Sequence, residues 1–283
     1  MPAVELSLGV TLAVLGAAFL HALWNALLKS SAGEPLLDTA LIVAGSSVVA
    51  LAVLPFVDVP ARSAWTFIAL SSVIHFAYYI TLAGAYRRGD LSFAYPLMRG
   101  VAPLFVTVLG VLFLGEHPTG QMLAGIALIS LGIIGIAWFA SGRHTPTAAG
   151  WALANAAIIA VYTLVDGAGV RVSGSAAGYV TWLIFLEGLP FLAWLYWHRG
   201  PAAARYVALR WRRGLAGGTA SLAAYGIVLW AMTQAPVAVV AALREVSVLF
   251  AALIGALALK EGLGWRRMAG AATVVAGVAA LKL

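Results

Sequence analysis

Apolar segments about as long as a bilayer is thick follow one another along almost the whole chain. A transmembrane helix needs roughly 20 predominantly apolar residues. The sequence predicts ten such segments, at 5–28, 36–57, 64–86, 92–114, 119–140, 147–170, 176–198, 213–234, 238–259 and 265–282. The connections are short, so neighbouring helices must run antiparallel. We therefore expect an all-α integral membrane protein with no separate domain outside the bilayer.

The composition supports this expectation and excludes several classes of protein. Of the 283 residues, 63% are hydrophobic and 10% are charged, whereas soluble proteins carry about 25% charged residues. The chain has no cysteine, which excludes a disulfide framework, a thiolate nucleophile and a Cys-ligated metal. The net charge of +7 is scattered as single and paired residues. It does not form the basic face that nucleic-acid binding requires, and we expect no nucleic-acid partner.

Basic residues in the connections predict the orientation of the chain. Twelve of the seventeen lysines and arginines lie in the odd-numbered connections: Lys29, Arg87, Arg88, Arg143, Arg199, Arg205, Arg210, Arg212, Arg213, Lys260, Arg266 and Arg267. Arg62, Arg171 and Lys282 lie on the other side, with both termini. Connections rich in Lys and Arg stay in the cytoplasm, so both termini are predicted outside it. Glu5, in place of a basic leader, indicates a retained first helix. The Arg-, Ala- and Gly-rich composition suggests a bacterial inner membrane protein.

The chain also contains an internal repeat. Residues 99–136 align without a gap on 244–281, with 12 of 38 positions identical. The matches include Arg99 with Arg244 and, 17 residues later, Glu116 with Glu261. A repeat of about 145 residues divides ten helices into two units of five, 1–141 and 146–283. Five is odd, so the second unit is inverted in the membrane. Transporters use this design around a central cavity, because the two units can exchange roles.

The fourth segment places a charge inside the membrane. Arg99 lies between Pro96 and Pro103, and neither proline can donate a backbone hydrogen bond. Pro103 leaves the carbonyl of Arg99 free, and Gly100 adds flexibility. These residues predict a kinked helix whose arginine faces a solute site. The alternative is that Arg99 pairs with a carboxylate and holds two helices together.

The equivalent segment of the second unit carries two adjacent charges, Arg244 and Glu245. Adjacent residues on a helix point about 100° apart, so both cannot face one ligand. We expect one of them to line the cavity and the other to pair with a neighbouring helix. The sequence does not decide between the two assignments.

Other ionisable residues also lie in apolar segments. Asp166 and Glu187 are acids within such segments, and His21 and His75 are histidines. These residues could carry a coupling proton, since burial favours neutral forms, or they could form structural ion pairs. With Arg99, Arg244 and Glu245, the intramembrane charges nearly balance, which suits a zwitterionic solute.

Aromatic, glycine and loop-end residues complete the candidate set. Trp24, Tyr78, Tyr79, Tyr162, Tyr225 and Trp230 lie at similar depths, with Asn25 beside Trp24. They could flank a solute or anchor the chain at the membrane interface. Gly125 with Gly132, and Gly270 with Gly277, have a seven-residue spacing that predicts close helix packing. Glu116 and Glu261 end equivalent helices and are predicted to act as caps or orientation marks. No catalytic or metal-binding motif is present, so we expect neither enzyme activity nor a cofactor or metal.

These residues resemble the EamA family of the drug/metabolite transporter (DMT) superfamily. YPLMRGVAPLFVTVLGVLFLGE and ALREVSVLFAALIGALALKE carry the resemblance, supported by HALWNALLK and YTLVDGAGVR. It covers nearly the whole chain and is similar to the YddG-type exporters of amino acids and metabolites. The resemblance implies a central cavity lined mainly by the first, third, fourth, sixth, eighth and ninth helices. It also implies cytoplasmic termini in many members, in contrast to the orientation that the charges predict.

We therefore interpret the chain as a secondary transporter that exports amino acids or related small metabolites by alternating access. The predicted solute-binding residues are Trp24, His75, Tyr78, Tyr79, Arg99, Tyr162, Trp230, Arg244 and Glu245. His21, Asp166 and Glu187 are predicted to couple protons or form ion pairs. The expected partners are a small solute and the bilayer, and the expected state is a monomer. Efflux of toxic or drug-like compounds is the alternative function; a membrane scaffold and an intramembrane enzyme are the other classes.

Overall fold

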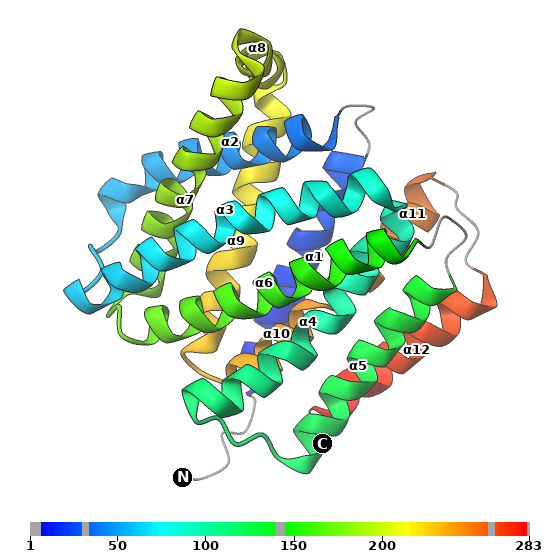
Figure 1. Cartoon of the computed structure of the whole chain (residues 1–283). Helices are drawn as coiled ribbons and strands as arrows, with labels where there is room; N and C mark the ends of the chain where they lie inside the picture. The colour runs from blue at the N-terminus through cyan, green and yellow to red at the C-terminus, as the bar shows by residue number, and fades with distance from the viewer. Residues whose placement is uncertain (1–6, 30–33, 140–144, 260–263, 282–283) are drawn as a thin grey trace.

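A computed structural model describes residues 7–29, 34–139, 145–259 and 264–281 (Figure 1). The described residues form helices and no strand. The α-helices are α1 (Leu8–Lys29), α2 (Pro35–Val53), α3 (Trp65–Arg88), α4 (Leu91–Leu114), α5 (Gly120–Trp138), α6 (Pro146–Arg171), α7 (Ala176–Arg199), α8 (Pro201–Leu209), α9 (Trp211–Met232), α10 (Val237–Arg244), α11 (Ser247–Leu259) and α12 (Trp265–Ala280). Two short 3₁₀ helices, η1 (Leu54–Phe56) and η2 (Arg62–Ala64), lie between α2 and α3.

Within the described residues, nine helical stretches are long and apolar enough to cross a membrane. The ninth, Val237–Ile254, runs through α10 into α11. The tenth predicted segment forms α12, whose shorter apolar part is Met268–Ala280. The all-α membrane fold is therefore confirmed, and the described residues contain nine full-length spans and one shorter apolar helix where ten spans were predicted.

The helices pack in symmetry-related pairs across the two predicted units. α3 packs on α6 as α1 packs on α9, and α2 packs on α9 as α3 packs on α7. α4 contacts α6 as α1 contacts α10 and α11. Three further contacts, α5 with α12, α2 with α7 and α4 with α10, join equivalent helices directly. This pattern fits two inverted five-helix repeats that interleave around a common centre.

The predicted glycine packing is confirmed at the contact between α5 and α12, which lie side by side in Figure 1. A Cβ added to Gly132 would lie 2.7 Å from the Gly270 carbonyl oxygen, and one added to Gly277 would lie 2.8 Å from that of Gly125. The two helices run antiparallel, so the first glycine of each pair meets the last of the other. Without side chains at these positions, the two backbones approach closely.

The connection at 199–213, expected to be a loop, contains a helix instead. Gly200 has φ 60°, a conformation that favours glycine, and Pro201 occupies the first turn of α8, where its missing N–H costs nothing. Arg199 forms an ion pair with Glu34. Tyr206 donates a hydrogen bond to Asp38 at 2.5 Å. The Tyr206 bond holds α8, and the Arg199 ion pair holds the end of α7, against the start of α2.

The second repeat contains an interruption of regular helix that the sequence does not predict. α4 is a single helix that contains both Pro96 and Pro103. The ninth segment, predicted as one helix over 238–259, instead divides between α10 and α11. Four backbone bonds there have 3₁₀ spacing: Glu245 N–H to Ala242 O, Val246 N–H to Leu243 O, Val248 N–H to Glu245 O, and Leu249 N–H to Val246 O. Stretches of 3₁₀ helix inside a longer helix often mark functional hinges.

Candidate functional site

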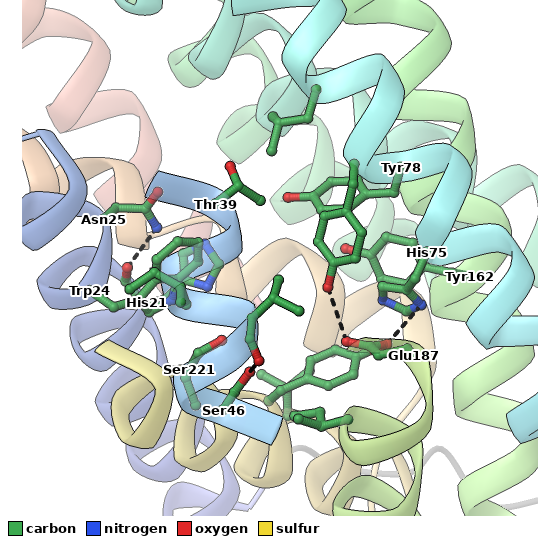
Figure 2. Close-up of a pocket in the computed structure, with 18 of the residues that line it drawn as sticks. His21, Trp24, Asn25, Thr39, Ser46, His75, Tyr78, Tyr162, Glu187 and Ser221 are labelled. Carbon is green, nitrogen blue, oxygen red and sulfur yellow. Dashed lines mark hydrogen bonds and ion pairs between the residues drawn. The ribbon is translucent and has the colours of Figure 1, made fainter. Parts of the chain in front are cut away.

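A cavity of about 170 Å³ lies among the helices of both repeats (Figure 2). It is lined by parts of α1, α2, α3, α4, α6, α7, α9 and α10. The family resemblance implied six of these helices, and the structure adds α2 and α7. The lining residues that carry polar groups or aromatic rings are His21, Trp24, Asn25, Thr39, Ser46, His75, Tyr78, Tyr79, Tyr86, Tyr95, Arg99, Tyr162, Glu187, Ser221, Tyr225 and Arg244.

Two arginines share one carboxylate in the wall of this cavity. Arg99 Nε lies 2.5 Å from Glu245 Oε2, and Arg244 Nε lies 3.4 Å from Glu245 Oε1. Arg99 and Arg244 are each 4% exposed, and Glu245 is fully buried. Two cations against one anion leave this side of the cavity with a positive charge. Arg99 Nη2 is buried and, among the described residues, has no hydrogen-bond partner.

The triad answers two questions that the sequence leaves open. Arg244 lines the cavity, whereas Glu245 lies behind the lining and bonds to α4 through Arg99. Arg99 also lines the cavity, so it contacts the cavity and joins two helices at once. The two alternatives for Arg99 are therefore compatible. The Glu245 side chain reaches α4 from the 3₁₀ turn that separates α10 from α11.

A second charged cluster contains the acid Glu187. His75 Nδ1 lies 3.2 Å from Glu187 Oε2, and the Tyr79 hydroxyl donates to Glu187 Oε1 at 3.2 Å. Figure 2 shows both contacts beside Tyr78 and Tyr162. The ring centroids of His75 and Tyr162 are 4.2 Å apart. An acid beside aromatic rings can hold a protonated amine by charge and by cation–π attraction.

Asp166 lies behind this wall and does not line the cavity. It is fully buried, and the Tyr179 hydroxyl donates to its Oδ1 at 3.0 Å. The hydroxyl of Tyr225, which lines the cavity, donates to its Oδ2. The Ser71 hydroxyl lies close to the same carboxyl. Asp166 therefore communicates with the cavity only through its hydrogen-bond partners.

Two aromatic rings and several small polar side chains form the opposite wall in Figure 2. His21, Trp24 and Asn25 come from α1, and they lie near Thr39, Ser46 and Ser221 of α2 and α9. The ring centroids of His21 and Trp24 are 4.9 Å apart, and Asn25 Nδ2 donates to the His21 carbonyl at 2.7 Å. Sequence reasoning missed the three hydroxyl residues, because single hydroxyls in apolar helices give no pattern.

Most of the predicted site residues are brought together, and three are not part of the lining. Trp24, His75, Tyr78, Tyr79, Arg99, Tyr162 and Arg244 line the cavity, as do His21 and Glu187. Glu245 and Asp166 lie directly behind the wall. Trp230 is 41% exposed and lies outside the lining, so its expected place beside the solute is not what the structure shows. A tryptophan near the end of α9 suits the membrane interface better.

Glu116 and Arg171 form an ion pair at the end of the bundle away from the cavity. Glu116 lies just beyond the C-terminus of α4, whereas Arg99 lies in that helix's first half. Glu116 Oε1 accepts hydrogen bonds from Arg171 Nη2 at 3.1 Å and from the backbone N–H of Val237 at 2.7 Å. Arg171 also donates to the carbonyls of Met232 and Ala235. Glu116 thus caps α10 of the other repeat rather than its own helix; Glu261 lies outside the described residues.

We expect Glu116→Ala to open the end of the bundle that the Glu116–Arg171 ion pair holds together. The substitution removes an ion pair and a helix cap, and hydrogen bonds to charged groups contribute about 1.5–3 kcal/mol each, equivalent to at least a tenfold change in an equilibrium. The chain has no cysteine, so a single Ala224→Cys in the cavity reports access without background. Labelling of that cysteine by an impermeant maleimide from the Glu116 side should accelerate. Glu34→Gln, at the Arg199 ion pair, is the control. Unchanged labelling from that side would show that Glu116 does not hold the end closed.

Two comparisons with known proteins bear on this arrangement. The sequence pattern of the EamA-like transporter family matches residues 7–138 and 146–283. The chain belongs to the EamA-like transporter family. No curated protein matches the chain. A solved structure titled only "Crystal structure of protein" is similar in fold, with a TM-score of 0.71 and 18% sequence identity over 96% of this chain and 94% of the other.

Membership makes the chain a multi-pass membrane transporter whose partners are a small-molecule solute and the lipid bilayer. The EamA-like pattern matches twice, once in each predicted repeat. The central cavity, lined by helices of both matches, is therefore the candidate solute site. The chemical class of the solute has to be inferred from the lining residues described above.

Proposed function

We propose that this EamA-like protein exports amino acids or related zwitterionic metabolites across the bacterial inner membrane by alternating access. The main support for the proposal is that two parts of one cavity carry opposite charges. Arg99 and Arg244 offer donors to a carboxylate, and Glu187 beside the rings of His75 and Tyr162 offers a site for an ammonium group. A solute with both groups satisfies both sites.

The size of the cavity supports a small solute. Its volume is about 170 Å³, whereas pockets for drug-sized ligands occupy roughly 300–1,000 Å³. The small polar wall of Thr39, Ser46 and Ser221 adds hydrogen-bonding groups for a polar solute. The resemblance to YddG-type exporters points to the same solute class.

Efflux of cationic drug-like compounds is the second candidate, and a different observation favours it. Glu187 lies among His75, Tyr78, Tyr79 and Tyr162, an arrangement that also attracts organic cations. The positive triad across the cavity opposes a solute that carries only positive charge. We therefore prefer the zwitterion.

The proposal also covers the two repeats and the orientation of the chain in the membrane. We propose 1–141 and 146–283 as the two inverted repeats, acting together as a monomer. The Lys and Arg distribution supports termini outside the cytoplasm. In that orientation the end closed by Glu116 faces outward. The cavity then lies nearer the cytoplasmic end, since its lining includes the last turns of α1 and the first half of α4.

We expect Arg244→Ala to weaken transport strongly without unfolding the protein. Glu245 would keep Arg99 as its partner, but the cavity would lose one donor for the solute carboxylate. A hydrogen bond between charged groups contributes about 1.5–3 kcal/mol, so the apparent affinity should fall about 10- to 150-fold. Uptake by proteoliposomes from a panel of labelled amino acids, sugars and cationic drugs measures the effect.

Arg62→Ala is the matched control, because Arg62 is exposed in η2 and does not line the cavity. It should transport as the parent protein does. If the parent protein moves a cationic drug and none of the amino acids, the drug-efflux candidate replaces the proposal.

A further inference from the structure

Within the part of the chain that the structure describes, two buried acids, Glu187 in the cavity wall and Asp166 behind it, have no arginine or lysine partner. Asp166 is fully buried and Glu187 is 7% exposed. Within the described residues, the ion pairs of Arg99, Arg171, Arg199 and Arg244 involve other carboxylates. Glu187 pairs only with His75, and Asp166 bonds only to hydroxyl groups. An ionised carboxylate away from water is costly unless it is compensated, so these two acids are suited to binding and releasing protons.

The hydroxyl partners of Asp166 allow both of its protonation states. Tyr179, Tyr225 and Ser71 can donate to the carboxylate, and a hydroxyl can also accept from the protonated acid. The site therefore needs no rearrangement of helices to gain or lose a proton. A carboxylate held by an arginine, such as Glu245, lacks this freedom.

Close polar contacts lead from one acid to the other. Ser71, which lies beside Asp166, has its Oγ 3.1 Å from His75 Nδ1. That nitrogen also lies 3.0 Å from the Ser71 carbonyl and 3.2 Å from Glu187 Oε2. A carbonyl oxygen can only accept, so Nδ1 carries a hydrogen in this arrangement. The contacts run from Asp166 through Ser71 and His75 to Glu187.

We propose that Asp166, Ser71, His75 and Glu187 form a proton relay in the cavity wall, through which proton entry drives solute export. A proton from cavity water binds His75 Nε2. Nδ1 then passes its own hydrogen to Glu187, or to Ser71 Oγ as the Ser71 hydroxyl passes its hydrogen to Asp166. Either route leaves the imidazole neutral and one acid protonated. When a solute ammonium group reaches Glu187, the acid returns its proton to water. This inference rests on the proposed function, because it assigns the coupling ion of the same cavity.

Ionisable side chains on the neighbouring helices face the relay. Tyr79 is on α3, Tyr162 on α6, Tyr179 on α7 and Tyr225 on α9. Arg244 of α10 is the cation whose charge reaches both His75 and Asp166. Arg99 of α4 is held by Glu245, and Asp38 of α2 bonds to Tyr206. Because α3 belongs to one repeat and α6, α7 and α9 to the other, movement between the repeats would alter the relay.

Asp166→Asn separates coupling from solute binding, because Asp166 does not line the cavity. In proteoliposomes, solute added outside should make the lumen more alkaline, because solute that enters through the parent protein is exchanged for protons that leave. A trapped pH dye reports the change. Asp166→Asn and Glu187→Gln should lower this proton flux by about tenfold or more. Asp166→Asn should keep counterflow exchange of labelled amino acid at equal pH. Glu34→Gln is the matched control, since it makes a carboxylate-to-amide change at an exposed ion pair.

Two outcomes overturn the relay, and they differ from failure of the proposed function. Counterflow without any proton flux in the parent protein shows a transporter that does not couple protons. Proton flux in both variants equal to that of the parent shows coupling elsewhere. Infrared difference spectra of the purified protein between acidic and alkaline buffer test the relay even if no amino acid is transported. A carboxylic acid band should titrate in the parent and weaken in each variant, and identical spectra would contradict the relay.

Discussion

Glu245→Ala is expected to lower the free energy of unfolding by about 3–5 kcal/mol, because it leaves two buried arginines without a carboxylate. Arg99 and Arg244 are each 4% exposed, and Glu245 is their shared ion-pair partner. Removing the centre of this triad also removes the side-chain bond between α10 and α4. Thermal unfolding of the purified protein in detergent, followed by tryptophan fluorescence, measures the change.

Two further variants separate the contributions of charge and shape within this triad. Glu245→Gln keeps the size and an acceptor but removes the negative charge, so its loss of stability should be smaller than that of Glu245→Ala. Arg244→Ala leaves one arginine paired with one glutamate and should unfold near the parent temperature. If all three variants unfold at the parent temperature, the triad does not contribute to stability.

Gly45→Ala is expected to force α2 and α9 apart and to remove most of the folded protein. A Cβ on Gly45 would lie 1.8 Å from the carbonyl oxygen of Gly214. On the other helix, a Cβ on Gly218 would lie 2.2 Å from the backbone nitrogen of Ser46. These are backbone atoms, which cannot turn away as a side chain could. Overpacking typically costs about 1–3 kcal/mol and occasionally more, and this contact lies at the severe end.

Gly45→Ala should also disturb the cavity, because Ser46 and Ser221 lie on the same two helices and line it. Gly16→Ala and Gly150→Ala are matched controls, since a Cβ at either position meets no atom within 4 Å. Alanine is favoured over glycine inside a helix by about 0.5–1 kcal/mol, so both controls should be neutral or slightly stabilising. The folded yield on size-exclusion chromatography measures all three. A parent-like yield for Gly45→Ala would show that α2 and α9 pack less closely than the structure indicates.

The repeat and the helix-packing glycines show what a single sequence can predict in a membrane protein. Apolar length alone predicted the helices, because backbone groups in lipid must be satisfied within each segment. The seven-residue glycine spacing on α5 and α12 predicted a packing face, which the structure confirms. The charged residues in apolar segments were also informative, because such charges are costly and rarely occur without a role.

Other parts of the site gave no signal in the sequence. Thr39, Ser46 and Ser221 are isolated hydroxyls, and any membrane helix can satisfy a hydroxyl on its own backbone, as Ser46 does with the Val43 carbonyl. The two prolines of α4 predicted a kink there, but no residue pattern predicted the 3₁₀ turn beside Arg244 and Glu245 of the other repeat. Local backbone chemistry does not reveal which side chain a distant helix will bind.

The sequence by itself determined the membrane class, the family, the repeat and the set of intramembrane charges. These follow from segment length, from the alignment of one half on the other, and from the cost of placing charge in lipid. Only the tertiary structure decided the partners: Arg99 with Glu245, His75 with Glu187, Asp166 with three hydroxyls, and Glu116 with α10 of the other repeat. The partners lie on different helices, so their pairing depends on how the two repeats interleave and not on spacing along any one segment.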